Sequence, residues 1–250
     1  MDLFDYMRET TKEKESPLAS RLRPTTLDEV VGQQHIIGKD KLLYRAIKAD
    51  KLSSVIFYGP PGTGKTTLAK VIANTTSAEF TQINATVAGK KDMEEVVNKA
   101  KELKGMYQKR TILFIDEIHR FNKGQQDYLL PFVEDGTLIL IGATTENPSF
   151  EVIRPLLSRC QLYVLKSLEK EDLLELLQRA ITTDAILKER KIELKETTAM
   201  LRFSGGDARK LLNILELVVQ SETEETVVIT DEMVTERLQQ NPLAYDKDGE

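Results

Sequence analysis

Nine consecutive residues carry the most specific chemical signal in the sequence. They read Gly59, Pro60, Pro61, Gly62, Thr63, Gly64, Lys65, Thr66 and Thr67. The first eight fit G-x-x-x-x-G-K-[ST], the spacing of a loop whose backbone N–H groups surround phosphate oxygens. In such a loop the lysine reaches the β- and γ-phosphates of a nucleoside triphosphate, and the hydroxyl after it ligates Mg²⁺. We therefore predict a site for a nucleoside triphosphate and Mg²⁺ in this segment, which we call the phosphate loop.

The residues on either side of the phosphate loop support this interpretation. Residues 54–58 before it are mostly β-branched or aromatic over the length of a strand, and Leu68, Val71 and Ile72 after it have helical spacing. The motif requires this strand–loop–helix context, which disfavours an ordinary Gly/Pro-rich surface turn. The glycine spacing also excludes a dinucleotide fingerprint, which would read G-x-G-x-x-G.

Two carboxylates follow a second apolar segment. Residues 112–115 are four successive apolar residues, as in a strand buried on both faces, and Asp116 and Glu117 come directly after them. Ligands bind at the carboxyl ends of strands in open α/β sheets. We predict that Asp116 ligates Mg²⁺, directly or through water, and that Glu117 orients the attacking water as a base. Such a pair often only starts a helix, but the phosphate loop upstream favours the catalytic interpretation.

Other polar residues come after predicted strands or at a predicted helix start. Residues 143–147 end the strand at 137–142 and could touch the γ-phosphate or the water. Asp207 is predicted to cap a helix, which puts Arg209 in its first turn, where the helix dipole disfavours cations. A cation in this unfavourable position favours a role for Arg209 in binding phosphate. The alternative is a surface arginine that the helix tolerates. His119 and His35 are interpreted as structural hydrogen-bonding residues.

The composition limits the class of protein. The 250 residues are 40% hydrophobic and 30% charged, with a net charge of −5, which suits one large or two modest globular domains. Nucleic acid would therefore have to bind a local basic face. A lysine-rich segment at 90–110 offers one, although a solvated helix face is the usual alternative. The single cysteine, Cys160, forbids an intramolecular disulfide and suits the reducing cytosol. We find no signal peptide and no apolar run near the roughly 18 residues of a membrane helix.

The order of the predicted elements indicates two domains. Strands and helices alternate over residues 52–166, which predicts an α/β fold with a parallel sheet flanked by helices. From about residue 168 the period is helical only. We expect a flexible tail at 1–16, an α/β domain at 17–166, a small all-helical domain at 167–240 and a linker at 241–250. The leader at 17–33 could form a wall of the base and ribose site, or be a plain helix and turn.

Taken together, these motifs resemble the AAA+ ATPases, specifically the clamp-loader clade. Ser158-Arg159-Cys160 looks like the arginine-finger motif of the clade, and residues 206–209 look like its sensor-2 motif, in which Arg209 contacts the nucleotide. The leader from Arg21 to Gln33 resembles the box that contacts adenine, through Leu22, Val31 and Gly32. Asn84 matches the asparagine thought to restrain the catalytic glutamate. Thr144 stands at the sensor-1 position, where clamp loaders often carry asparagine.

The segments at 17–38, 116–127 and 141–151 look more closely like the replication-associated recombination protein A family, whose eukaryotic relatives are the Werner-helicase-interacting ATPases. The resemblance implies a cytoplasmic, nucleoid-associated, DNA-dependent ATPase acting at stalled or damaged replication forks. It also implies partners: DNA forks, ends and junctions, single-strand-binding protein, and replication or recombination proteins. Family members continue into a helical region that assembles tetramers, so we expect this chain to be an ATPase-core fragment with a helical lid. A nucleotide-gated adaptor with little turnover is the main alternative; a small-molecule kinase is another.

Overall fold

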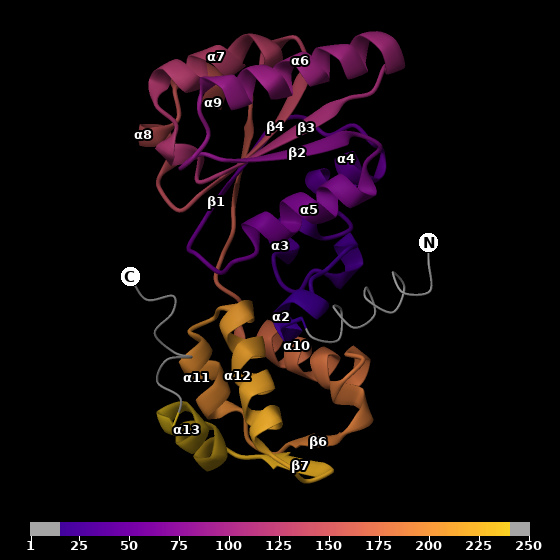
Figure 1. Ribbon diagram of the computed structural model, residues 1–250, viewed down its shortest axis with the longest axis vertical. Helices are drawn as coiled ribbons and strands as arrows, with labels where there is room; N and C mark the ends of the chain where they lie inside the picture. The colour runs from indigo at the N-terminus through magenta and orange to yellow at the C-terminus, as the bar shows by residue number, and fades with distance from the viewer. Residues whose placement is uncertain (1–15, 241–250) are drawn as a thin grey trace. The chain divides into compact units, whose positions relative to one another are not determined.

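The computed structural model of the protein describes residues 16–240 (Figure 1). The chain forms two compact units. One is an α/β unit of residues Pro24–Ser167, and the other joins residues 16–23 to the chain from Leu168 onward, here called the C-terminal unit. The predicted tail at 1–16, apart from Ser16, and the predicted linker at 241–250 lie outside the described residues.

The α/β unit is built on one five-stranded sheet in the order β2-β3-β4-β1-β5. Its strands are β1 (Val55–Tyr58), β2 (Glu79–Asn84), β3 (Thr111–Asp116), β4 (Leu138–Thr144) and β5 (Gln161–Val164). All neighbouring strands are parallel, which confirms the predicted sheet. Because the strands are parallel, their carboxyl ends lie at one edge, where Tyr58 pairs with Thr144 and Asn84 pairs with Asp116.

Helices cover both faces of this sheet (Figure 1). On one face lie η1 (Leu27–Glu29), α3 (Gln34–Ile37), α4 (Leu42–Lys48) and α5 (Lys65–Thr75), and on the other α6 (Lys90–Tyr107), η2 (Ile118–Arg120), α7 (Lys123–Glu134) and α9 (Arg154–Leu157). A short helix, α8 (Pro148–Glu151), follows β4. Successive strand residues point to opposite faces. Phe57 and Phe114 therefore join the core on the α5 face, while Ile56 and Leu113 join the core on the α6 face.

The C-terminal unit is mainly helical, as predicted, but it is not all-helical. Its helices are α2 (Leu18–Arg21), α10 (Lys170–Thr183), η3 (Leu187–Glu189), α11 (Thr198–Ser204), α12 (Ala208–Ser221) and α13 (Asp231–Gln240). It also contains a parallel two-stranded sheet, β6 (Lys191–Leu194) with β7 (Thr226–Ile229). Both strands have only four residues and follow charged segments, so their period-two pattern is too short to stand out from the helical period predicted for this part of the chain.

The leader segment divides between the two units, which differs from the predicted boundary at residue 17. Leu18 is fully buried, and its N–H donates to the Glu216 carboxylate on α12 at 3.0 Å. Arg21 donates to both carboxylate oxygens of Asp184, at 2.8 and 3.1 Å, and also pairs with Glu216. A charged pair so far apart in sequence has no local pattern, so the sequence could not indicate that this segment packs in the C-terminal unit.

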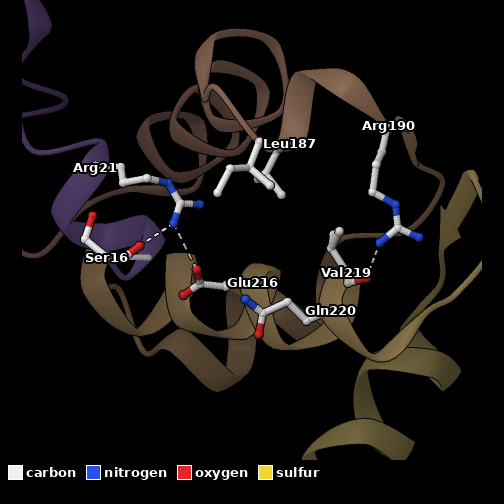
Figure 2. Close-up of a pocket in the computed structure, with 8 residues that line it drawn as sticks. Ser16, Arg21, Leu187, Arg190, Glu216, Val219 and Gln220 are labelled. Atoms are coloured by element: carbon white, nitrogen blue, oxygen red, sulfur yellow. Dashed lines mark hydrogen bonds and ion pairs between the residues drawn. The ribbon is translucent and has the colours of Figure 1, made fainter. Parts of the chain in front are cut away.

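A cavity of about 240 Å³ lies beside this ion pair, within the C-terminal unit (Figure 2). Arg21 and Glu216 line one side of it, and Arg190 lies on the other, where its guanidinium donates to the carbonyl oxygen of Val219. Arg21 is paired with Asp184 and Glu216, whereas the printed partners of Arg190 are backbone carbonyl oxygens.

Candidate nucleotide-binding site

The phosphate loop connects β1 to α5 at the carboxyl edge of the sheet. The Gly59 N–H donates to the carbonyl oxygen of Thr144 at 3.2 Å, which ties the loop to the end of β4. A Cβ at position 59 would lie 2.5 Å from the carbonyl oxygen of Leu165, so only glycine fits there. Gly62 and Gly64 have φ angles of 74° and 93°, in the left-handed region that glycine adopts readily. The glycines therefore set the shape of the loop, as the motif predicts.

Lys65 lies inside this loop with only 9% of its surface exposed. Its Nζ donates to the carbonyl oxygens of Gly59 and Pro60 at 2.8 and 2.7 Å. Burial lowers the pKa of the Lys65 ammonium, an effect that the nearby Asp116 carboxylate partly opposes. The carbonyl contacts thus hold a cation within the loop, where the oxygens of a bound phosphate would offer stronger, charged partners.

Thr66 and Asp116 meet although they come from different elements. The Thr66 hydroxyl on α5 donates to the Asp116 carboxylate at the end of β3, with an oxygen–oxygen distance of 3.4 Å. A hydroxyl and a carboxylate beside a phosphate loop are suitable ligands for Mg²⁺, which is bound through few protein oxygens plus water and phosphate. Within residues 16–240 no group of three or more His, Cys, Asp or Glu side chains could hold a metal ion. The two residues therefore fit an ion that is completed by nucleotide and water.

Glu117 follows Asp116 in a strained conformation. Its φ and ψ angles are 52° and 46°, a left-handed conformation that residues with a Cβ seldom adopt and that clusters at functional sites. Its N–H donates to the Asp116 carboxylate at 3.1 Å, and its own carboxylate accepts from Arg120 Nε at 3.1 Å. The side chain is 44% exposed, so solvent can reach this carboxylate.

Thr144 ends β4 but is only 1% exposed. Its hydroxyl oxygen accepts from the Glu146 N–H at 2.9 Å, lies 2.9 Å from His119 Nδ1 and lies 3.2 Å from the Glu146 carbonyl oxygen. The hydroxyl is thus already occupied by protein groups. The exposed residue at this strand end is Thr145, which the sequence analysis did not single out. All residues of β4 are buried, so no alternation within the strand separates the two neighbours, and Thr145 is exposed because it lies just beyond the strand.

Both histidines make side-chain hydrogen-bond contacts, and their structural roles stay predictions. His119 holds Thr144 as described, and His35 Nε2 lies 2.8 Å from the carbonyl oxygen of Val164 on β5. Asn84 lies beside Asp116 in the register of β2 and β3. Its carboxamide oxygen accepts from the N–H and hydroxyl of Thr86, at 2.9 and 2.7 Å. Its effect on Glu117 stays a prediction.

Arg159 lies after α9, and its side chain is 49% exposed. It pairs with Glu134 at the end of α7 at 2.9 Å and donates to the Ser158 hydroxyl at 3.0 Å. Neither partner belongs to the phosphate loop. The role of Arg159 as an arginine finger stays a prediction. To bind a phosphate, Arg159 would have to break its ion pair with Glu134.

The remaining predicted nucleotide contacts come from both units. Val31 and Gly32 belong to the α/β unit, whereas Leu22 and Arg209 belong to the C-terminal unit. The cap at α12 is confirmed, because the Asp207 carboxylate accepts from the N–H groups of Arg209 and Lys210 at 2.7 and 3.1 Å. Arg209 itself is exposed. A role for Leu22 and Arg209 at the nucleotide stays a prediction.

Comparison with known families agrees with this geometry. Residues 55–168 match the model of the ATPase family associated with various cellular activities, and residues 187–250 match the model of an AAA C-terminal domain. The chain belongs to the AAA family of ATPases. The first match covers the sheet, the phosphate loop, the acidic pair and Arg159, but not the leader or residues 206–209, which also carried the sequence-based resemblance.

Among curated AAA proteins, the chain is 47% identical to replication-associated recombination protein A of Coxiella burnetii, over 94% of this chain and 54% of that protein. It is 44% identical to the protein of the same name from Escherichia coli K12, over 94% of this chain and 54% of that protein. It is also 37% identical to ATPase WRNIP1 of Dictyostelium discoideum, over 99% of this chain and 30% of that protein. The chain thus spans about half the length of the bacterial relatives.

Among solved AAA structures, the fold is similar to the Thermotoga maritima RuvB Holliday junction branch migration motor. The TM-score is 0.69 at 29% sequence identity, covering 87% of this chain and 72% of that chain. Both the parallel sheet and the helical C-terminal unit are therefore of the kind found in this family. Among the described residues, no helix has the length and apolar character to cross a membrane.

Proposed function

We propose that this chain is the ATPase core of a protein that acts on DNA in replication-associated recombination and repair. The observation that carries the proposal is the meeting of the Thr66 hydroxyl and the Asp116 carboxylate beside the phosphate loop. This contact supports an arrangement in which the residues proposed for phosphate, Mg²⁺ and an attacking water lie at one edge of the sheet. The names of the relatives support the link to replication and recombination.

In this proposal each residue of the site has a stated task. The phosphate loop binds the triphosphate through its backbone N–H groups and Lys65. Thr66 and Asp116 hold Mg²⁺, which neutralises charge on the phosphates. Glu117 orients the attacking water and accepts its proton. Thr144 and the exposed Thr145 beside it are the candidates to contact the γ-phosphate.

The wider roles expected from the family belong to the same proposal. They are DNA-dependent hydrolysis, a tetrameric assembly in the full-length protein, action at forks, ends and junctions, and contacts with single-strand-binding protein in the nucleoid. A nucleotide-gated adaptor is the second candidate, since the Lys65 contacts would also suit a switch. The exposed, strained Glu117 favours hydrolysis, because a pure switch needs no residue to orient water.

The test measures ATP turnover of the full-length protein without DNA and with single-stranded, duplex, forked and four-way junction DNA. We expect turnover that depends on Mg²⁺ and rises with branched DNA. Tight ATP binding without turnover on any DNA would support the adaptor. Absence of ATP binding would overturn the assignment of the site.

A further inference from the structure

Gln33 is a buried polar residue in an unfavourable backbone conformation. Only 6% of its surface is exposed, and its φ and ψ angles are 57° and 25°. A residue with a Cβ pays a steric penalty in this left-handed region, and it stays there only when its surroundings hold it. The contacts of its side chain show what holds it.

The Gln33 carboxamide bonds two separate segments of the α/β unit. Its Nε2 donates to the carbonyl oxygen of Lys166 at 2.7 Å, and its Oε1 accepts from the Lys166 N–H at 3.1 Å. The same Nε2 donates to the carbonyl oxygen of Thr63, in the phosphate loop, at 3.3 Å. Only a primary amide can make this set, because it needs two N–H groups and one acceptor on a single planar group.

The two segments joined by Gln33 have different tasks. Thr63 is part of the loop that would surround the phosphates, and its hydroxyl also donates to Pro60 within that loop at 2.9 Å. Lys166 precedes Ser167, the last residue before the chain leaves the α/β unit. The preceding residue, Leu165, already abuts the loop, since its carbonyl oxygen lies 2.5 Å from where a Cβ on Gly59 would be.

We propose that Gln33 is a positioning residue that couples the conformation of the phosphate loop to residues 165–167, where the chain leaves the α/β unit. The inference rests on the proposed binding of ATP at this loop. In the structure Lys65 is bonded to the carbonyl oxygens of Gly59 and Pro60. When Lys65 turns to a phosphate, these hydrogen bonds break, and the loop is held instead by the anion. The Thr63 carbonyl is then fixed, and with it the Gln33 amide and the Lys166 N–H.

Two variants separate the side-chain contacts from the backbone conformation. Gln33→Glu keeps the length of the side chain but has no N–H, and it puts a negative charge against two carbonyl oxygens. Gln33→Asn keeps the amide and tolerates the left-handed backbone, but it is one methylene too short to reach both segments. Gln34→Glu is the matched control, because Gln34 is the exposed neighbour and undergoes the same change of charge.

The experiment measures amide hydrogen exchange of the 250-residue chain with and without ATP–Mg²⁺, comparing Lys166 with buried amides of β3. In the wild type and in Gln34→Glu we expect ATP to slow exchange at Lys166. In Gln33→Glu and Gln33→Asn this response should be absent, and ATP affinity should fall about tenfold, as for the removal of roughly one hydrogen bond. Unchanged exchange in β3 would show that the variants remain folded.

Two outcomes would overturn the inference while leaving the ATP site intact. In one, ATP binds the wild type without changing exchange at Lys166. In the other, both Gln33 variants bind ATP and keep the wild-type response. A wild type that does not bind ATP at all would instead overturn the proposed function, so the two failures are distinguishable.

Discussion

At the scale of single residues, Lys65 has the most sharply defined environment in the candidate site. Its ammonium is buried, and its described partners are neutral carbonyl oxygens of its own loop. Burial that lowers the pKa of a lysine makes its charged form costly, and an anion in the loop would remove that cost. This environment of Lys65 therefore favours binding of a phosphate over a structural ion pair.

We expect Lys65→Ala to weaken ATP binding severely, by about 1.5–3 kcal/mol for each charge-assisted hydrogen bond to phosphate that the variant cannot form. Titration of the chain with a fluorescent ATP analogue would measure the affinity. Lys70→Ala, on the same helix, is the control, and it should bind as the wild type does. Unchanged affinity in Lys65→Ala would contradict the assignment of the phosphate loop.

For Glu117 we expect that Glu117→Gln still binds ATP–Mg²⁺ but hydrolyses it about 10²–10⁴ times more slowly, as is usual when a general base is removed. The amide keeps the shape of the side chain but accepts no proton. Single-turnover hydrolysis, measured alongside binding, separates the two effects. Glu102→Gln, on the exposed face of α6, controls for the change of charge. Normal turnover in Glu117→Gln would mean that another residue acts as the base.

At the scale of elements, the structures that depend on local sequence patterns could be predicted, whereas contacts between distant segments through single polar groups could not. The strand–loop–helix around Lys65 and the strand ending at Asp116 follow from local patterns, so their positions were predicted closely. The meeting of Thr66 with Asp116 followed from the rule that parallel strands share a carboxyl edge. The pairing of Arg21 with Asp184 and the contacts of Gln33 join distant segments through single polar groups, and no local pattern encodes them.

The lysine-rich helix α6 gives a second example, because the sequence shows its charges but not the groups with which they pair. The sequence offered Lys90, Lys91, Lys99, Lys101, Lys104, Lys109 and Arg110 as a basic face. In the structure, Lys99 and Lys109 both pair with Glu79, at 3.0 and 2.9 Å. Lys101 lies over the ring of Phe132, with its Nζ 4.8 Å from the ring centroid. Much of this charge is therefore engaged in contacts within the α/β unit.

We expect replacement of Lys90, Lys91, Lys99 and Lys101 by alanine to reduce the salt dependence of DNA binding, by roughly one unit of slope for each lysine that pairs with a phosphate. The measurement is the affinity for forked DNA over a series of salt concentrations. Alanine at Lys170, Lys188, Lys191 and Lys195 removes the same charge from the C-terminal unit as a control. Equal slopes for the α6 variant and the wild type would place the DNA surface on another part of the protein.

At the scale of the whole molecule, the placement of Arg159 bears on assembly. Its guanidinium pairs with Glu134 and Ser158 rather than with its own phosphate loop, and it is half exposed. Lys65 and a Mg²⁺ ion would already supply cations to the nucleotide of the same chain. These observations support our prediction that Arg159 adds charge at the nucleotide of a neighbouring subunit.

We expect Arg159 to act on the nucleotide of a neighbouring subunit, where an arginine finger is worth roughly 10³–10⁵ in turnover. This chain should then bind ATP yet hydrolyse it slowly when dilute. Arg159→Ala should keep ATP affinity nearly intact while removing the activity of the assembled full-length protein. The decisive measurement mixes inactive Glu117→Gln subunits with inactive Arg159→Ala subunits. Some interfaces then join an intact Glu117 to an intact Arg159, so partial activity should return. If subunits exchange and no activity returns, Arg159 acts within its own chain or is not the finger.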